Sequence, residues 1–278
     1  MKVLESLKEN NLSSENLSFV PTMGALHKGH AALVQEAKMK NEKVIVSIFV
    51  NPAQFNDKED FLKYPKTIER DIEIASSVGA DYVYIPSVEE IYPNGYESKL
   101  ILQIPSLMKN LCARTRPGHF EGVMLVISRL FHLVQPKKAY FGKKDYQQYL
   151  IISEFTKSLG FPVEVIGVET VRNENGLALS SRNERLTQSG LEDATLIYRS
   201  MKIAEELFHK NKSTKVKKLQ SAITEILLSS NKIKIDYVEI LDPKTLDELS
   251  SIENDFFIGI AAFIEGVRLI DNYTVRYA

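Results

Sequence analysis

The sequence predicts an α/β protein, with a doubly wound parallel sheet followed by a second, smaller C-terminal α/β domain. Apolar, β-branched runs alternate with helix-forming segments from Leu17 to Val168, and glycine-bearing turns follow several of these runs. Strands separated by helices of this length imply right-handed crossovers and hence a parallel sheet. The pattern changes after Glu184. We therefore expect a large domain over residues 1–184 and a small one over residues 185–278.

In the large domain, each predicted element rests on a local pattern. Strands are expected at residues 17–20, 43–49, 82–85, 138–141 and 162–168, and helices at residues 31–39, 67–78, 122–135 and 146–159. The run at 43–49 indicates a central strand, because a parallel sheet that is covered on both sides needs apolar residues on both faces. Pro65 shortly precedes the helix at 67–78, and Pro86 stops the strand at 82–85.

The small domain is predicted to contain two helices and three strands. The helices are expected at residues 188–209 and 213–228, and the strands at residues 234–240, 256–262 and 268–273. Ile264, Glu265 and Gly266 stand between the last two strands. A glycine-containing turn between two apolar runs indicates a β-hairpin.

The composition is that of an ordinary globular protein: of its 278 residues, 44% are hydrophobic and 26% are charged. The formal net charge of −1 argues against a nucleic-acid-binding surface, which needs a clustered basic excess. Cys112 is the only cysteine, which excludes a disulfide framework and fits a reducing compartment. Residues 1–11 lack the apolar core of a secretory signal, and no run approaches the ~20 apolar residues of a membrane span. We therefore expect a cytoplasmic protein without a membrane partner.

The most informative segment is PTMGALHKGH at residues 21–30, directly after the first buried strand. A strand, a glycine-bearing turn and a helix form the first unit of a nucleotide-binding sheet, and the helix start is a natural seat for phosphate. Gly24 and Gly29 have the spacing of a P-loop, but a histidine stands where that motif requires lysine. The alternative is a pair of surface histidines. Because such turns are where α/β sheets bind ligands, we favour a nucleotide site that uses His27 and His30.

A second polar segment, FVNPAQF, follows the second predicted strand of the series. The carboxyl ends of parallel strands face the ligand crevice, so Asn51 and Gln54 would project into it. The alternative for Asn51 is turn chemistry, since Asn-Pro often begins a loop. Gln54 is the better candidate for a neutral hydrogen bond to a small polar substrate.

Three further segments have the same placement. Residues 114–122, RTRPGHFEG, form a cationic, glycine-bearing loop before a helix, for which a solvated basic turn is the alternative. In FGKKDYQQ, Gly142 permits close backbone approach, and Lys143 or Lys144 could place a charge on phosphate. Gln148 lies one helical turn beyond Lys144. Five polar loops at successive strand ends favour one site over five independent turns.

The last of these segments is LALSSRN, after the final strand of the large domain. Ser180, Ser181 and Arg182 place two hydroxyls and a guanidinium on what we expect to be a flexible loop with few apolar anchors. Such a loop suits the gripping of a triphosphate by closure.

Taken together, these segments resemble the pantoate–β-alanine ligase (pantothenate synthetase) family. PTMGALHKGH, FVNPAQF, RPGHFEGV, FGKKDYQQ and LALSSRN occur in that family's order and spacing, and the resemblance is thinner after residue 185. The HKGH element by itself is similar to the HxGH element of the class I nucleotidyl-transferase superfamily, which is Rossmann-like. Two positions depart from the family pattern: Leu179 stands where many members carry Met, and Ile74 where some carry a polar, metal-linked side chain.

The resemblance implies ATP-dependent condensation of pantoate with β-alanine through a pantoyl-adenylate, with release of AMP and pyrophosphate. A carboxylate is already ionised at pH 7, so its attack on phosphorus needs charge neutralisation and alignment instead of a general base. The implied catalytic residues are His27, His30, Lys144 and Arg182. No covalent enzyme intermediate is needed, so Cys112 has no nucleophilic role.

The resemblance also implies a set of binding residues. The ATP-binding positions are Met23, Gly24, His27, Gly29, His30, Gly142, Lys143, Lys144, Asp145, Val171, Leu179, Ser180, Ser181 and Arg182. The substrate-binding positions are Asn51, Gln54, Tyr64, Arg116, His119 and Gln148. Asp71 is the candidate for a Mg²⁺ contact through water, and a solvated helix-surface aspartate is the alternative. The family further implies a homodimer, and a small domain that acts as a lid.

Two other functions are compatible with part of this pattern. A different adenylyltransferase, which transfers AMP to a phosphorylated metabolite, would share the histidine pair but should lack the Gln54 and Gln148 elements. A non-catalytic nucleotide-binding module would be expected to lose some of the histidines or Lys144. All of these residues are present in the chain.

Overall fold

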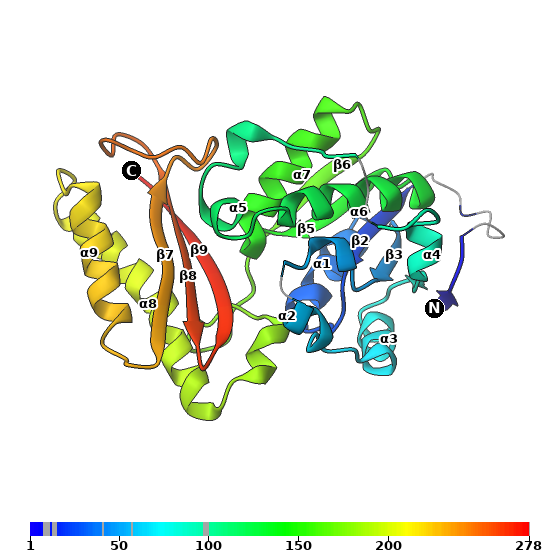
Figure 1. The fold of residues 1–278 in the computed structure, drawn as a ribbon, viewed down its shortest axis with the longest axis horizontal. Helices are drawn as coiled ribbons and strands as arrows, with labels where there is room; N and C mark the ends of the chain where they lie inside the picture. Colours follow the sequence, from blue (N-terminus) through cyan, green and yellow to red (C-terminus); the bar gives the residue numbers. More distant parts are fainter. Residues whose placement is uncertain (8–11, 13–15, 41, 57, 97–99, 278) are drawn as a thin grey trace. The chain divides into compact units, whose positions relative to one another are not determined.

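The computed structural model describes residues 1–7, 12, 16–40, 42–56, 58–96 and 100–277 (Figure 1). Residues 8–11, part of the segment expected to lack a secretory signal, lie outside the described residues. The chain forms two compact units. Unit 1 contains Met1–Ile104, Arg116–Lys143 and Gln148–Thr170, and unit 2 contains Pro105–Thr115, Lys144–Gln147 and Val171–Ala278.

Unit 1 is built on a parallel sheet with the order β1-β4-β3-β2-β5-β6, which confirms the predicted fold class. Its strands are β1 (Lys2–Leu4), β2 (Leu17–Thr22), β3 (Lys43–Ile48), β4 (Tyr82–Tyr84), β5 (Lys138–Gly142) and β6 (Glu164–Val168). The chain winds outward from β2 through β3 and β4 on one side and continues through β5 and β6 on the other. Ligands bind at the carboxyl ends of strands where the order reverses, here between β2 and β5.

Helices cover both faces of this sheet (Figure 1). The main ones are α1 (Lys28–Lys38), α3 (Ile68–Ser77), α6 (His119–Val134) and α7 (Tyr146–Ser158), all of which the sequence predicted. Val20 of β2 belongs to a buried cluster with Leu33 of α1 and Ala75 of α3. Phe19, its neighbour in β2, packs edge-on against Phe131 of α6 with ring centroids 6.4 Å apart. Neighbouring residues of a strand point to opposite faces, so the two helix layers lie on opposite sides of the sheet.

Several short elements escape sequence prediction. They are β1, α2 (Lys58–Leu62), α4 (Val88–Ile91), α5 (Leu111–Thr115), and the 3₁₀ turns η1 (Pro52–Gln54), η2 (Pro105–Leu107), η3 (Lys143–Asp145) and η4 (Ser181–Arg185). None is long enough to establish an apolar period. Helix α6 begins at His119 instead of residue 122, because Gly118 at its N-cap turns the chain with a φ of +83°.

Unit 2 contains an antiparallel sheet with the order β7-β8-β9, the two long helices α8 and α9, and the short helix α5 (Figure 1). The elements are β7 (Ile233–Leu241), β8 (Phe256–Ile264), β9 (Val267–Val275), α8 (Gln188–Lys210) and α9 (Val216–Leu227). Glu265 and Gly266 join β8 to β9 with φ values of +51° and +79°, which confirms the predicted hairpin with a turn that requires positive φ. Phe208 of α8 and Ile223 of α9 share one buried core with Ile260 of β8.

In the part of the chain that the structure describes, no helix is long and apolar enough to cross a membrane.

Glu42 ties three strands of unit 1 together at their amino-terminal ends. Its carboxylate, just before β3, accepts hydrogen bonds from Ser18 Oγ of β2 and Lys138 Nζ of β5, and from the Tyr140 hydroxyl at 3.4 Å. Burial raises the pKa of Glu42, but the hydrogen bonds from Lys138 and Ser18 outweigh this and hold the pKa below its ordinary value. The charged carboxylate therefore stabilises the order β3-β2-β5.

We predict that Glu42→Gln lowers the free energy of unfolding at pH 7 by about 1–3 kcal/mol, the range for losing hydrogen bonds to a charged group. A carboxyl whose pKa is lowered by folding stabilises above its unfolded pKa, roughly 4.3, and this contribution disappears as the pH falls through the folded pKa. The free energies of unfolding of the two proteins in urea should therefore differ at pH 7 and differ less at pH 3. Glu73→Gln, on an exposed carboxylate of α3, is the control. If the free energies of unfolding differed equally at both pH values, the charge of Glu42 would not be what stabilises the strand order.

Candidate active site

Gly24 lies at the centre of the turn between β2 and α1. Its φ is +70°, and a Cβ atom there would lie 2.6 Å from Asp71 Oδ2 and 3.2 Å from Ile48 Cγ2. The Tyr64 hydroxyl donates a hydrogen bond to the Gly24 carbonyl oxygen at 2.9 Å. The turn is therefore held from two sides, and glycine is the residue that fits at its centre.

Asp71 is buried, with 1% of its surface exposed, so the alternative of a solvated helix-surface aspartate is wrong. Its Oδ1 atom accepts hydrogen bonds from the Leu26 N–H group at 2.6 Å and from Thr67 Oγ1 at 3.0 Å. Hydrogen bonds to a charged acceptor are stronger than neutral ones. A side chain of α3 thus fixes the backbone directly before His27.

His27 and His30 cap the start of α1 with their own rings. His27 Nδ1 accepts a hydrogen bond from the Gly29 N–H group at 3.0 Å, and His30 Nδ1 accepts one from the His27 N–H group at 3.3 Å. This is the reciprocal pattern of a capping box, with imidazole nitrogens as the acceptors. The ring centroids are 4.1 Å apart.

These caps determine the tautomer of both rings. A nitrogen that accepts a hydrogen bond carries no proton, so the proton of each neutral ring is on Nε2. His27 and His30 are therefore two neutral imidazoles, each with an Nε2–H donor, at the carboxyl end of β2. Donors of this kind suit a negatively charged oxygen.

Asn51 is the hub of the second predicted segment and is 1% exposed. Its Nδ2 atom donates to Gln54 Oε1 at 2.9 Å and to the Gly122 carbonyl at 3.1 Å. Its Oδ1 atom accepts from the Ala53 N–H group at 3.2 Å and the Tyr92 hydroxyl at 2.7 Å. These bonds use both donors and both acceptor positions of the amide. Asn51 thus orients Gln54, which supports the turn interpretation of Asn51.

His119 connects the third segment to Gln54. Its Nε2 atom lies 3.0 Å from Arg116 Nη1, and its Nδ1 atom lies 2.9 Å from the Gln54 carbonyl oxygen. A guanidinium only donates, so Nε2 accepts and the proton is on Nδ1, the opposite tautomer to that of His27. Gln54 Nε2 in turn donates to Met23 Sδ at 3.1 Å. Met23, Gln54 and His119 therefore form one hydrogen-bonded set.

Gly122 brings α6 and η1 into direct contact. A Cβ atom at this position would lie 2.2 Å from the Ala53 carbonyl oxygen and 2.8 Å from Gln54 Cα. The close approach lets the Gly122 carbonyl accept the hydrogen bond from Asn51. By contrast, nothing among the described residues lies within 4 Å of a Cβ atom added to Gly142, at the end of β5.

The two lysines of FGKKDYQQ have different surroundings. Lys143, in unit 1, forms an ion pair with Glu169. Lys144, in unit 2, has a side chain that is 19% exposed, with its ammonium group 3.8 Å from Asp145 Oδ1. Lys144 is therefore the better candidate for a charge directed at phosphate. Gln148 is half-buried on α7.

The segment that carries Ser180 begins as a narrow hairpin in unit 2. Arg172 and Ala178 form an isolated β-bridge, and the Leu179 N–H group donates to the Val171 carbonyl at 3.0 Å. Ser180 then caps η4 by accepting from the Arg182 N–H group at 3.3 Å, and Ser181 is 7% exposed.

The prediction that this loop has few apolar anchors is wrong. Leu177 and Leu186 are buried in the core of unit 2, and Ala178 is buried too. The sequence did not predict this burial, because the residues between Val171 and Leu177 are polar and their composition is typical of a mobile loop. The Ser180 segment is thus an integral part of unit 2.

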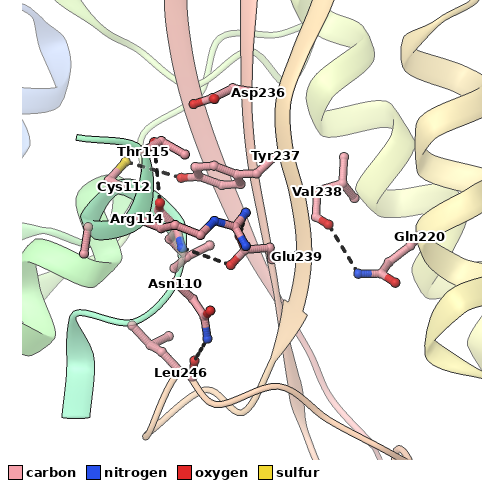
Figure 2. A network of polar contacts seen from close by, with 12 residues as sticks. Asn110, Cys112, Arg114, Thr115, Gln220, Asp236, Tyr237, Val238, Glu239 and Leu246 are labelled. Carbon is pink, nitrogen blue, oxygen red and sulfur yellow. Dashed lines mark hydrogen bonds and ion pairs between the residues drawn. The ribbon is translucent and has the colours of Figure 1, made fainter. Parts of the chain in front are cut away.

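Helix α5, which sequence reasoning missed, is fastened to β7 within unit 2 (Figure 2). The Leu111 N–H group donates to Glu239 Oε2 at 3.0 Å, Arg114 pairs with Glu239 Oε1 at 2.5 Å, and Cys112 Sγ lies 3.3 Å from the Tyr237 hydroxyl. Burial raises the pKa of Glu239 and raises the pKa of Tyr237 well above its ordinary value. Cys112 therefore packs α5 against β7.

The predicted site residues divide between the two units. Unit 1 holds Met23, Gly24, His27, Gly29, His30, Asn51, Gln54, Tyr64, Asp71, Arg116, His119, Gly142, Lys143 and Gln148. Unit 2 holds Lys144, Asp145, Val171, Leu179, Ser180, Ser181 and Arg182. Among the described residues, no group of three or more His, Cys, Asp or Glu side chains is arranged to hold a metal ion.

Gln147 was not singled out from sequence, although it stands beside Gln148. It is buried, and its Nε2 atom donates to the Leu107 and Asn110 carbonyls, at 2.9 Å each. Its Oε1 atom accepts from the Ala113 N–H group at 3.3 Å. Gln147 therefore fixes the chain around α5.

A doubly wound parallel sheet with a His-x-Gly-His helix start defines a Rossmann-like domain of the kind that binds nucleotides. Within this class, the family model described as pantoate-beta-alanine ligase matches residues 1–274. The chain belongs to this family of ligases.

Known relatives match over nearly the full length. The pantothenate synthetase of Leptospira interrogans is 53% identical over 275 residues, which cover 99% of this chain and 95% of that protein. The crystal structure of pantothenate synthetase from Thermus thermophilus has a TM-score of 0.92 and 41% identity, covering 98% of this chain and 99% of that one. The pantoate-β-alanine ligase of Francisella tularensis, complexed with β-γ ATP and β-alanine, has a TM-score of 0.79 and 34% identity, covering 98% and 97% of the two chains.

We predict that Gly122→Ala lowers the free energy of unfolding by about 1–3 kcal/mol, the range for overpacking a tight contact. The direction of the change in the free energy of unfolding is informative, because alanine is otherwise favoured over glycine inside a helix by about 1 kcal/mol. Gly142→Ala is the matched control, since its added methyl group meets open space, and should not be destabilising. Urea unfolding of both variants checks this, and equal stabilities would contradict the close contact.

Proposed function

We propose that this chain catalyses the ATP-dependent condensation of pantoate with β-alanine to give pantothenate, AMP and pyrophosphate. The observation that carries the proposal is the pair of Nε2–H imidazoles at the start of α1, beside the reversal point of the sheet. Membership of the pantoate–β-alanine ligase family supports the same reaction.

In the first step, a pantoate carboxylate oxygen would attack the α-phosphorus of ATP. A bond forms between that oxygen and phosphorus, the bond to the bridging oxygen breaks, and pyrophosphate leaves with the electron pair. His27 and His30, at the positive end of the α1 dipole, would donate to the phosphate oxygens. Lys144 and Arg182 would neutralise charge, and the remaining ATP contacts would come from Met23, Gly24, Gly29, Gly142, Lys143, Asp145, Val171, Leu179, Ser180 and Ser181.

In the second step, the neutral amine of β-alanine would attack the acyl carbon of pantoyl-adenylate. The C–N bond forms, the bond between acyl carbon and phosphate oxygen breaks, AMP leaves with the electron pair, and the nitrogen gives up one proton to solvent. Gln54 and Gln148 would hold pantoate through its hydroxyl and carboxylate groups. Asn51, Tyr64 and His119 would act by holding Gln54 and the Gly24 turn in place, and Arg116 by engaging His119.

Mg²⁺ would enter this site with the triphosphate. The ion binds through few protein carboxylates, several waters and substrate phosphates, which fits the buried carboxylate of Asp71 beside the Gly24 turn. When bound, it would neutralise phosphate charge. Asp71 would contact it through water.

We further propose that residues 1–184 bind ATP and pantoate and that residues 185–278 act as a lid. The enzyme would work as a cytoplasmic homodimer, with pantoate, β-alanine and ATP as its small-molecule partners and no nucleic-acid or membrane partner.

His30→Ala and Lys144→Ala should each slow adenylation by roughly two to three orders of magnitude, the range for losing one preorganised charge stabiliser. The assay is pantoate-dependent ATP–pyrophosphate exchange, with AMP and ADP resolved in the full reaction. His209→Ala and Lys210→Ala, near the end of α8, are matched controls. If the His30 or Lys144 variant exchanges pyrophosphate at a near-normal rate, the active site lies elsewhere. If the full reaction gives ADP instead of AMP, the chain activates pantoate as an acyl phosphate and not as an adenylate.

Asp71→Asn should raise the Mg²⁺ concentration needed for half-maximal exchange, because asparagine keeps an acceptor for the Leu26 N–H group but loses the charge. Thr67→Val is the matched control, since it removes one hydrogen bond to Asp71 and leaves the carboxylate. If the Mg²⁺ dependence of Asp71→Asn is unchanged, Asp71 does not contact the ion and serves only to hold the turn.

Amide hydrogen exchange across residues 173–186 should slow when ATP is added, because the ligand supplies contacts that favour the closed state of a lid. Mass spectrometry of peptides from this range provides the measurement, and peptides from α9 serve as the reference. Exchange that stays unchanged at saturating ATP would contradict the lid.

A further inference from the structure

Two neighbouring residues of β9, Asp271 and Asn272, contact both of the proposed triphosphate-binding elements of unit 2. All of the residues concerned lie within that unit. Neither residue was singled out by the sequence, and neither belongs to the proposed set of binding residues.

Asp271 holds the hairpin through Arg172. Arg172 Nη1 donates to Asp271 Oδ2 at 2.5 Å, and Nη2 donates to Asp271 Oδ1 at 2.9 Å, which is a bidentate ion pair. The pair is buried, with side-chain exposures of 16% for Arg172 and 4% for Asp271. The guanidinium also lies 4.0 Å from the ring centroid of Tyr198. Arg172 is thus fixed from several directions.

Arg172 in turn sets the shape of the hairpin that leads to Ser180. Its Nη1 atom donates to the Gly176 carbonyl at 3.1 Å, near the tip, and its backbone bridges to Ala178. Gly176 has a φ of +85°, and a Cβ atom there would lie 2.4 Å from Tyr198 Cδ1. The hairpin is therefore closed by Arg172 and seated on Tyr198, with Ser180 following directly.

Asn272 holds the other element. Its Nδ2 atom donates to the Lys144 carbonyl oxygen at 2.7 Å, and its own carbonyl accepts from Arg172 Nη2 at 3.1 Å. One dipeptide of β9 thus bonds to the backbone of Lys144 and to the arginine that shapes the Ser180 segment. Both residues of this platform are paired with β8, Asp271 opposite Ile260 and Asn272 opposite Gly259.

We propose that Asp271 and Asn272 are positioning residues that set the distance between Lys144 and the Ser180–Arg182 segment, and thereby the affinity for the ATP triphosphate. This inference rests on the proposed function. Neither side chain would touch substrate. Catalysis by fixed charges depends on donors that are held in place before the substrate arrives, and such holding is done by a second layer of buried hydrogen bonds.

The test compares Asn272→Ala with Tyr273→Phe in pantoate-dependent ATP–pyrophosphate exchange. Asn272→Ala should raise KM for ATP about tenfold, the effect of one hydrogen bond, and leave KM for pantoate unchanged. Tyr273→Phe is the matched control on the same strand, because it keeps the ring that packs against Tyr198 and loses the hydroxyl hydrogen bonds to Glu205 and Lys202, which the proposed positioning does not use. It should lower the thermal midpoint and leave KM for ATP unchanged.

A double-mutant cycle shows whether Asn272 acts through Lys144. In the Lys144→Ala background, Asn272→Ala should change the exchange rate by less than about twofold, because the ammonium group that it positions is gone. An equal loss in both backgrounds, or an Asn272→Ala protein that differs from wild type only in its thermal midpoint, would overturn the inference.

Asp271→Asn and Asp271→Glu test the other half of the platform. Asparagine keeps the shape but loses the charge, and should raise KM for ATP, whereas glutamate should restore part of the affinity. If Asp271→Asn does not fold, the double-mutant cycle of Asn272 and Lys144 still tests the inference. Absence of pantoate-dependent exchange in the wild-type protein would instead refute the proposed function itself.

Discussion

The arrangement of the first half of the site depends on one constraint, the use of both Nδ1 atoms of His27 and His30 as helix caps. Once each Nδ1 atom accepts a backbone N–H group, the ring proton must be on Nε2. The caps form only if the preceding turn has the right shape. Gly24, Tyr64 and Asp71 supply that shape through a positive φ, a hydroxyl on the Gly24 carbonyl and a carboxylate on the Leu26 N–H group.

Each half of the proposed site is supported from within its own unit. In unit 1, buried amides and a neutral imidazole hold Gln54, which suits hydrogen bonds to an uncharged hydroxyl group. In unit 2, the platform of Asp271 and Asn272 holds the cationic elements that would bind phosphate. The contacts that hold Gln54 and the contacts that hold Lys144 therefore each lie within one unit.

The sequence predicted the elements that have a long apolar period and the motifs that follow β2, β3, β5 and β6. The prediction that residues 114–122 also follow a strand is wrong, because this segment joins α5 to α6. The sequence did predict the parallel sheet, the C-terminal hairpin and the positions of His27, Gln54 and Lys144 in turns. It did not predict β1, which has only one buried residue, Leu4. The supporting contacts were also missed, because they join residues far apart in sequence: Asp71 is 45 positions from Leu26, and Asp271 is 99 positions from Arg172. No local pattern encodes such pairs.

The tautomers of His27, His30 and His119 can be measured in solution. Long-range ¹H–¹⁵N correlation spectra of the ¹⁵N-labelled protein at pH 7 distinguish a protonated from an unprotonated ring nitrogen. Single substitutions of His27, His30 and His119 would assign the signals. The structure predicts protonated Nε2 and unprotonated Nδ1 in His27 and His30, and the reverse in His119. A proton on Nδ1 of His27 or His30 would contradict the account.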